Sequence, residues 1–378
     1  DEKYAEALDL IRQDNVLPGI CGRICTHPCE TACRRAELDE AIAIRDIKRF
    51  IDDTAATAAA PVKKQAAHDA PGIAVIGSGP AGLAAAAELA RAGCGVTVYE
   101  EEPLPGGLLR YGVGRYRLPE DILDRDIDYI KSLGVTFICS HQVDVSLELE
   151  TLAKKHSGVI VATGTWLDRK LGVPGEDLNG CFTGIDFLAK IGNETPVKIG
   201  KKVAVVGGGN TAIDCCRTLV RKGVEKVYLV YRRTRKEMPA NEVEIVAAEH
   251  EGIEFVFLAA PNKVLGNEEK QVVGLEYLRM ELGEPDASGR RRPVPVAGSE
   301  TVLDVDMIIT AIGQSSDLSF RGKGDRLDDV KVTRWNTFDI DPATCKTNVP
   351  YIFAAGDAAG LRLAPRQSRS PPAPTRRR

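Results

Sequence analysis

The chain has 378 residues, of which 43% are hydrophobic, and a formal net charge of −4 at pH 7. This length predicts two or three domains with cores of their own. Because the charges are mixed, bulk electrostatics is excluded as a reason to bind nucleic acid or an anionic membrane, and we expect neither as a partner. No apolar run approaches membrane-spanning length and no signal peptide opens the chain, so we expect a cytoplasmic protein.

Residues 1–53 are predicted to form a small helical domain in which Cys21, Cys25, Cys29 and Cys33 recur at every fourth position. An uninterrupted helix would line these cysteines along one face, but Gly22 and Pro28 favour a loop with turns. Thiolates that converge from a loop suit zinc or an iron–sulfur cluster. The spacing is neither the usual bacterial ferredoxin run nor a zinc-finger pattern. Metal ligation is therefore favoured over buried or disulfide-bonded cysteines, and the metal stays open at this point.

The alanine-rich residues 54–70 are predicted to be a linker, and strands and helices alternate after them. A glycine-rich loop, Gly77–Gly82, stands between the apolar strand Ile73–Gly77 and a helix. The N–H groups and positive dipole end of such a helix suit a pyrophosphate. Glu100 ends the next strand, where an acid can bond a ribose diol; the alternative is an ordinary exposed acid.

The rest of the first dinucleotide-binding domain is predicted within 71–195. It comprises a helix near Glu120–Leu133 and strands at Val135–Cys139 and Gly158–Val161. Alternating strands and helices of this kind predict a doubly wound parallel sheet.

A second glycine-rich loop, Gly207–Ala212, follows the strand Val203–Val206, about 130 residues after the first. The next strand of this unit ends in Arg232 and Arg233. An acid at this place would repel a ribose phosphate, whereas paired guanidiniums would bind it with bidentate bonds. The alternative is a solvated surface pair. The repeat predicts one internal duplication and a second, inserted domain over 196–314 that binds NADP.

Three later segments are predicted to complete the second sheet: Ile253–Leu258, Val272–Glu281 and Asp306–Ala311. The chain then returns to the first domain over 315–360. A strand there ends in Gly356-Asp357, and Asp357 is expected to bond the ribityl or pyrophosphate part of a flavin. The alternative is a plain strand followed by a turn.

Neither the adjacent cysteines nor the histidines form a catalytic constellation. Cys215 and Cys216 fall within a predicted helix and are expected to be packing residues. No Cys-x-x-Cys follows the first loop, so the sequence offers no cysteine pair for disulfide exchange. We therefore predict that electrons leave through the N-terminal cysteines.

Both ends of the chain are unusual. It begins with Asp1, and residues 361–378 carry six arginines, four prolines and no acid. We expect a clipped start and an aberrant, misjoined basic tail; a disordered tail that meets nucleic acid is the alternative.

The chain resembles the small (beta) subunit of bacterial glutamate synthase and its relatives. These include the electron-input half of dihydropyrimidine dehydrogenase and NADPH-linked ferredoxin oxidoreductase subunits of anaerobes. The resemblance covers about Pro18 to Gly360. Its motifs are the four cysteines, Gly77–Gly82, Gly106–Gly112 with Arg117-Leu118-Pro119, Gly207–Asp214, Tyr231–Arg233 with Glu237–Ala240, Ala311–Gln314 and Ala355–Asp357.

The resemblance implies an α/β fold of two Rossmann-like domains, for FAD and NAD(P), preceded by a small helical iron–sulfur domain. It implies FAD at Gly77, Gly79, Ala81, Gly82, Glu100, Gly107, Leu108, Thr163, Gly164, Gly356 and Asp357. It implies NADPH at Gly207, Gly209, Asn210, Thr211, Arg232 and Arg233. It also implies a [4Fe-4S] cluster on Cys25, Cys29 and Cys33, with Cys21 dispensable.

The implied activity is an NADPH-dependent oxidoreductase that needs no acid–base residue. It would pass electrons through FAD and the cluster to a partner, either a catalytic subunit like the glutamate synthase large subunit or a ferredoxin. The alternatives are an NAD(P)H:ferredoxin-type reductase subunit and a truncated, non-catalytic scaffold. Three features depart from the family: an upstream cysteine block is missing, Gly114-Arg115 replaces a usual proline, and the basic tail replaces a helix after Asp357.

Overall fold

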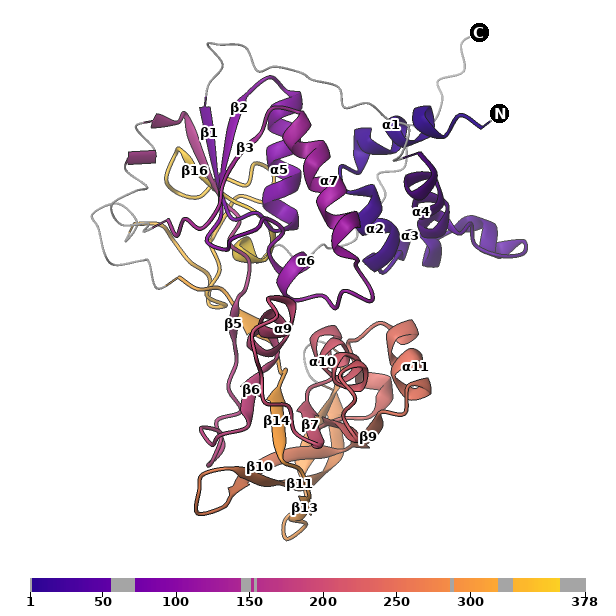
Figure 1. The fold of residues 1–378 in the computed structure, drawn as a ribbon, viewed down its shortest axis with the longest axis vertical. Helices are drawn as coiled ribbons and strands as arrows, with labels where there is room; N and C mark the ends of the chain where they lie inside the picture. Colours follow the sequence, from indigo (N-terminus) through magenta and orange to yellow (C-terminus); the bar gives the residue numbers. More distant parts are fainter. Residues whose placement is uncertain are drawn as a thin grey trace.

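The computed structural model describes residues 2–55, 72–143, 151–152, 155–285, 289–318 and 329–360. Most of the predicted linker and the whole basic tail lie outside these residues. Figure 1 shows two βα bodies, one above the other, with a group of helices beside the upper body. We call the upper body the first unit and the lower body the second unit.

The N-terminal residues form short helices, as expected for residues 1–53. These are α1 (Tyr4–Asp14), α2 (Pro18–Ile24), α3 (Pro28–Thr31), a 3₁₀ turn (Arg34–Glu37) and α4 (Ile44–Ala55). Val16, Leu17 and Ile20 pack into the same hydrophobic core as the helices of the first unit. The N-terminal helices are therefore anchored to the first unit by apolar burial, the dominant favourable contribution to such packing.

The first unit is a five-stranded parallel sheet with the order β16-β4-β1-β2-β3. Its strands are β1 (Gly72–Ile76), β2 (Gly95–Tyr99), β3 (Thr136–Ile138), β4 (Gly158–Val161) and β16 (Ile352–Ala354). Its helices are α5 (Pro80–Arg91), α6 (Leu108–Tyr111), α7 (Glu120–Ser132) and the 3₁₀ turn η3 (Gly356–Ala359). The predicted return of the chain to this sheet is observed, because β16 pairs with β4.

The second unit repeats this plan, with the order β6-β14-β7-β8-β9. Its strands are β6 (Cys181–Thr183), β7 (Lys202–Val206), β8 (Lys226–Tyr231), β9 (Glu254–Phe257) and β14 (Met307–Thr310). Its helices are α9 (Gly184–Gly192), α10 (Asn210–Arg221), the 3₁₀ turn η2 (Arg235–Glu237) and α11 (Glu242–His250). Cys215 and Cys216 lie wholly buried in its core, in agreement with the packing role expected for them.

Sheet membership bears on the boundary between the units. β6 and α9 fall within the predicted first domain, yet β6 pairs in parallel with β14 of the second sheet. We therefore propose that the second domain begins near β6 and not at residue 196. The chain crosses between the units twice, and the crossings pair side by side as β5 (Leu167–Asp168) and β15 (Gln314–Ser315).

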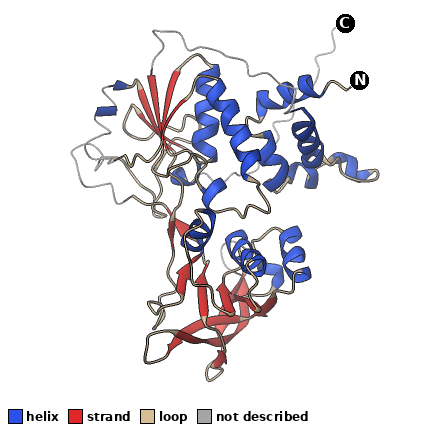
Figure 2. Ribbon diagram, viewed as in Figure 1, coloured by secondary structure: helices blue, strands red, loops and turns tan. Residues whose placement is uncertain are grey.

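One expected strand joins a different sheet. The segment Val272–Glu281 lies in β11 (Val272–Pro285), which pairs antiparallel with β10 (Ala259–Gly266), β12 (Arg291–Pro295) and β13 (Thr301–Leu303). Its assignment to the parallel sheet was wrong. Among the described residues between these strands there is no helix, so short connections join them as antiparallel neighbours. Figure 2 shows this second layer of strands beneath the lower sheet.

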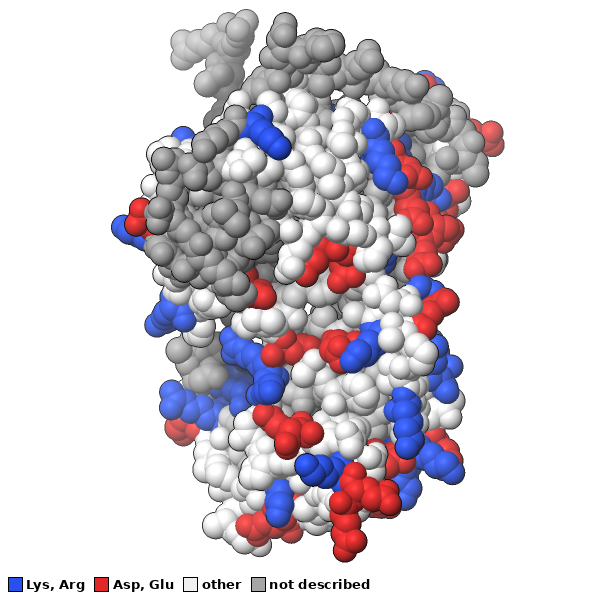
Figure 3. Space-filling view, turned by 60° about the vertical axis from the view of Figure 1, so that its left-hand side comes forward, with Lys and Arg blue, Asp and Glu red and all other residues white. Residues whose placement is uncertain are grey.

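Among the described residues, no helix combines the length and apolar character needed to cross a membrane. On the face shown in Figure 3, acidic and basic side chains are interspersed over both units.

Candidate functional site: two glycine-rich loops and a cysteine turn

The first glycine-rich loop is shaped by close backbone contacts. Gly77 has a φ of 97°, and a Cβ on it would lie 2.6 Å from the Ala162 carbonyl oxygen. A Cβ on Gly82 would lie 2.0 Å from the Gly77 oxygen, so only glycine lets α5 approach the loop this closely. In contrast, a Cβ on Gly79 would meet no protein atom within 4 Å. The loop therefore has a tight base and an open position at the start of α5, as a pyrophosphate cradle requires.

Three other segments that were predicted to bind FAD meet this loop. A Cβ on Gly107 would lie 2.7 Å from the Cα of Gly79, and one on Gly356 would lie 2.7 Å from the Cβ of Ala81. The Thr163 hydroxyl is buried near Gly77 and has no hydrogen-bond partner among the described residues. Leu108 begins α6, Gly164 has an open Cβ position and Asp357 is exposed. The structure thus gathers the predicted segments at one sheet edge; their contacts with FAD stay predictions.

Glu100 is buried against the loop. Its carboxylate accepts hydrogen bonds from the backbone N–H of Ser78 at 2.8 Å, from the Ser78 hydroxyl and from the Glu102 N–H at 2.9 Å. Ser78 also accepts a hydrogen bond from Gly106 N–H, which ties the loop to the Gly106-Gly107 turn. The carboxylate thus braces the loop in this structure, and its bond to a ribose remains a prediction.

The second loop repeats this geometry. A Cβ on Gly207 would lie 2.2 Å from the Ala311 oxygen, whereas one on Gly209 would meet no protein atom within 4 Å. Asn210 and Thr211 open α10, and both are held by side-chain hydrogen bonds. The Asn210 Oδ1 accepts from the Asn241 N–H at 2.9 Å, and the Thr211 hydroxyl accepts from Gln314 at 3.2 Å. Asn241 was not foreseen, because it lies 31 residues from Asn210 and carries no motif signal.

The arginines after β8 differ in their surroundings. Arg232 is exposed, and it has no hydrogen-bond or ion-pair partner in the part of the chain that the structure describes. Arg233 is buried, and its Nε–H donates to the Arg291 carbonyl at 2.8 Å. Arg235 pairs with Glu242 and Glu249 on α11. Of the two predicted phosphate ligands, Arg232 is the one with its guanidinium available.

The cysteines are spread over turns, as Gly22 and Pro28 indicated. Cys21 lies in α2, Cys25 caps it, Cys29 lies in α3 and Cys33 precedes the 3₁₀ turn. Burial raises the pKa of the Cys21 thiol, which packs against the core of the first unit. The backbone N–H groups of Ile42 and Arg35 lower the pKa of the Cys33 thiol.

These donors fit an iron–sulfur cluster in kind, since thiolates that accept N–H hydrogen bonds are its usual ligands. Cys25 likewise accepts a hydrogen bond from the His27 N–H at 3.3 Å. The cysteine side chains do not converge on one point in this structure. Among the described residues, no group of three or more His, Cys, Asp or Glu side chains is arranged to hold a metal.

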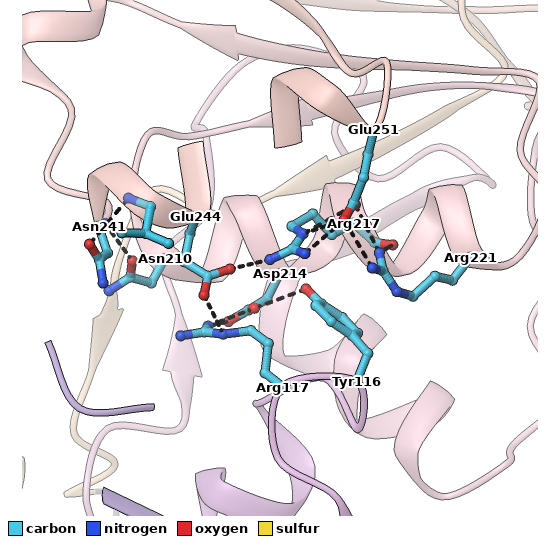
Figure 4. A network of polar contacts seen from close by, with 10 residues as sticks. Tyr116, Arg117, Asn210, Asp214, Arg217, Arg221, Asn241, Glu244 and Glu251 are labelled. Atoms are coloured by element: carbon cyan, nitrogen blue, oxygen red, sulfur yellow. Dashed lines mark hydrogen bonds and ion pairs between the residues drawn. The ribbon is translucent and has the colours of Figure 1, made fainter. Parts of the chain in front are cut away.

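A cluster of charged side chains that no motif predicted joins the two units (Figure 4). Arg117, from the loop after α6, donates to both carboxylate oxygens of Asp214 on α10, at 2.8 Å each. The Tyr116 hydroxyl donates to the same carboxylate at 3.2 Å. Burial raises the pKa of Asp214, while the Arg117 charge opposes this shift. Because 97 residues separate Arg117 from Asp214, no local pattern could have found the pair.

Comparisons with known proteins fit this geometry. Residues 71–373 match the family model "pyridine nucleotide-disulphide oxidoreductase", and residues 1–60 match "dihydropyrimidine dehydrogenase domain II, 4Fe-4S cluster". The fold resembles that of FprA from Mycobacterium tuberculosis in complex with NADPH, with a TM-score of 0.63 and 20% identity over 77% of this chain and 79% of that chain. This likeness concerns the fold alone.

Curated relatives are closer in sequence. The beta subunit of the NADP(+)-dependent formate dehydrogenase of Moorella thermoacetica is 42% identical over 94% of this chain and 53% of that protein. The beta subunit of the NADPH-Fe(3+) oxidoreductase of Geobacter sulfurreducens is 46% identical over 89% of this chain and 50% of that protein. The chain spans about half the length of these two relatives.

A third relative is matched over most of its length. The glutamate synthase [NADPH] small chain of Azospirillum brasilense is 36% identical over 94% of this chain and 76% of that protein. Together, the family models and this match indicate FAD, NADPH and a 4Fe-4S cluster as the cofactors. The chain therefore belongs to the pyridine nucleotide-disulphide oxidoreductase family, within the group of glutamate synthase small chains.

Proposed function

We propose that this chain takes electrons from NADPH onto FAD and passes them through an iron–sulfur cluster to a partner polypeptide. The observation that carries this proposal is the pair of glycine-rich loops, each with a tight base and an open position at Gly79 or Gly209. Two such cradles in adjacent units allow two dinucleotides to be held at once. When bound, FAD accepts a hydride from NADPH and can release its electrons one at a time.

The residues of the chain would bind and orient these groups. In the first unit the N-terminus of α5 would face the FAD pyrophosphate, and Thr163 would offer its buried hydroxyl as a hydrogen-bonding group. In the second unit the N-terminus of α10 would face the NADPH pyrophosphate, and Arg232 would bind the ribose phosphate. Cys25, Cys29 and Cys33 would ligate the cluster.

The partner is proposed to be a catalytic subunit. Relatives named as the small chain of glutamate synthase and as the beta subunit of formate dehydrogenase support a role as one subunit of a larger assembly. An NADPH-linked reductase subunit whose acceptor is a ferredoxin or another iron centre is the second candidate. It is favoured by the 46% identity to the NADPH-Fe(3+) oxidoreductase beta subunit.

Alanine at the two open glycines tests the proposal. Gly79→Ala adds a methyl group that meets no protein atom, so the protein should fold while its retained FAD falls by about tenfold or more. Gly209→Ala should keep FAD and weaken NADPH binding by a similar factor, about tenfold. The measurements are flavin absorbance per mole of protein and the bleaching of the flavin bands on addition of NADPH.

Gly95→Ala is the matched control, because a Cβ there also meets nothing within 4 Å but lies away from both loops. It should retain FAD and bleach like the unaltered chain. Equal FAD content in Gly79→Ala and Gly95→Ala would contradict the assignment of the first loop. A colourless, folded parent protein would support the scaffold alternative.

A further inference from the structure

The side chain of Arg117, a residue of the first unit, reaches a group of charged side chains on the second unit (Figure 4). It lies in the loop between α6 and α7 of the first unit, whereas its partners Asp214 and Glu244 lie on α10 and α11 of the second. Its Nη1 is 2.8 Å from both oxygens of Asp214, and its Nε is 3.1 Å from a Glu244 oxygen. The side chains of Arg117 and Asp214 are only 12% and 4% exposed, so this is a desolvated ion pair.

The carboxylates that Arg117 meets are held in place by arginines of the second unit. Arg217 pairs with Glu244 and Glu251, and Arg221 pairs with Glu251. The ring of Tyr116 lies against these arginines, with its centroid 3.9 Å from the Arg221 guanidinium and 4.8 Å from that of Arg217. The first unit thus presents a cation and an aromatic ring to a fixed set of carboxylates and guanidiniums.

This arrangement, which we call the clasp (Tyr116, Arg117, Asp214 and Glu244), favours one relative orientation of the units. If the units turned apart, Arg117 and Asp214 would lose each other as partners. Each charge would then remain partly buried without a counter-charge, and breaking a buried pair in this way is strongly unfavourable. Arg117 reaches two carboxylates through different nitrogens, Nη1 to Asp214 and Nε to Glu244, and a lysine ammonium at the same place would not reproduce this planar arrangement. The clasp therefore constrains the angle between the two units as well as the distance between them.

The clasp lies on the elements that carry the two cofactor loops. Asp214 is one turn along α10 from Asn210, whose helix N-terminus would face the NADPH pyrophosphate. On the other side, Arg117 follows α6 in the chain, and α6 begins beside Gly107, which contacts Gly79 of the FAD loop. A change of angle at the clasp would thus change the distance between the two cradles.

We propose that Arg117 is a positioning residue that holds the NADPH unit against the FAD unit in the orientation needed for hydride transfer. This inference rests on the proposed function. It assigns to Arg117 no contact with either cofactor; its effect passes through Asp214 and Glu244. Hydride transfer needs the reacting atoms at about 3–3.5 Å, so a small rotation between the units would slow it strongly.

The first arm of the test measures the protein without cofactors. Arg117→Lys keeps the charge and loses the planar guanidinium, and Asp214→Asn keeps the shape and loses the charge. The backbone N–H groups of Arg117 and Leu118 bond to the Gly114 oxygen. Their hydrogen exchange should speed up by about tenfold in both variants if the clasp orders this loop. Lys202→Ala, which removes an exposed ion pair to Asp304 inside the second unit, is the control and should leave this exchange unchanged.

The second arm measures flavin reduction by NADPH in a stopped-flow instrument. Both variants should lower the limiting rate by about tenfold or more while the NADPH dissociation constant stays within about threefold, because the interaction lost is one of orientation. The flavin midpoint potential should not move. Millimolar guanidinium should restore part of the rate in Arg117→Ala, whereas methylammonium, which lacks the planar set of N–H donors that can face two carboxylates, should not.

Unchanged limiting rates in Arg117→Lys and Asp214→Asn would overturn the proposal, as would a loss explained wholly by weaker NADPH binding. The failure of the proposed function looks different: the unaltered, flavin-loaded chain would then not be reduced by NADPH at all. In that case the exchange measurement still decides whether Arg117 and Asp214 hold the loop.

Discussion

Arg232 and Arg233 are adjacent in the sequence and lie in different environments. Both follow the end of β8 in a bend, which places the two side chains in different surroundings. Arg232 is exposed, while Arg233 is buried and donates to the Arg291 carbonyl. We expect the two to contribute unequally to phosphate binding.

Arg232→Ala should reduce the preference for NADPH over NADH by about tenfold or more, since a hydrogen bond to a charged group contributes about 1.5–3 kcal/mol. Arg233→Ala should mainly lower thermal stability, because it removes a buried hydrogen bond at the edge of β12. Steady-state kinetics with both coenzymes checks this. Lys222→Ala, at the far end of α10, is the control; an unchanged preference in Arg232→Ala would disprove the assignment.

Asp126 is a buried carboxyl where the N-terminal helices meet the first unit. It lies on α7, accepts a hydrogen bond from the Ile20 N–H at 3.0 Å and faces Asp52, Arg12 and Arg125. Burial raises its pKa to about 7, because the charged form is poorly solvated there. The folded protein therefore binds this proton more tightly than the unfolded chain does.

The stability contributed by the Asp126 proton is full below the ordinary carboxyl pKa and is lost as the pH rises through about 7. Asp126→Asn cannot ionise, so its unfolding free energy relative to the unaltered protein should rise by about 1–3 kcal/mol between pH 4.5 and 8. Denaturant unfolding at several pH values measures this difference. Asp128→Asn, exposed on the same helix, should show no such trend, and a flat difference for Asp126→Asn would contradict the raised pKa.

At the scale of elements, the cysteine turn separates one structural thiol from three available ones. Cys21, Cys25 and Cys33 are all partly exposed and Cys29 is exposed, but only Cys21 of the four packs against the hydrophobic core of the first unit. Short elements such as α3 place Cys25, Cys29 and Cys33 on successive turns and not along one face of a continuous helix.

Cys25→Ser, Cys29→Ser and Cys33→Ser should each lower the iron and acid-labile sulfide content of the anaerobically purified protein by more than half, because thiolates are the ligands that hold such clusters. Cys21→Ala should keep the iron and lose only stability, as a buried thiol behaves as a small apolar group. Iron retained by all three serine variants, or lost in Cys21→Ala, would show that the ligand set is wrong.

At the scale of the whole molecule, the two units have separate cores. In the second unit, one core lies among α9, α10, α11 and the sheet and another lies between the sheet and the antiparallel strands β10 and β11, while two others belong to the first unit. The clasp and the paired crossings β5 and β15 join the units. Each unit should therefore respond mainly to its own ligand.

Heating should reveal this independence. FAD should raise the unfolding temperature of the first unit more than that of the second, and NADPH should do the reverse, because a ligand stabilises the form that binds it. Trp166 and Trp335, the only two tryptophans of the chain, lie outside the second unit, so their fluorescence follows the first unit while calorimetry follows both. Equal shifts by both ligands in both signals would show that the molecule unfolds as a single body.

The duplicated architecture was predictable because its determinants are local. In each unit the determinants follow one another within about a dozen residues. They are a buried strand, a glycine that has a positive φ or lies too close to other backbone for a side chain, and a helix. A Cβ would collide with backbone at Gly77, Gly82 and Gly207. Glycine is therefore required at these positions, and its spacing makes the loops recognisable in the sequence. The interruption of the cysteine helix by Gly22 and Pro28 is local in the same sense.

What only the tertiary structure decided depends on residues far apart in the chain. The pairing of β6 with β14, the antiparallel partners of β11 and the meeting of Arg117 with Asp214 all join distant segments. The surroundings of Arg233 likewise depend on β12, whose Arg291 carbonyl accepts its hydrogen bond. Sequence patterns record which face of an element is apolar, but which other element covers that face is set by the packing of the whole chain.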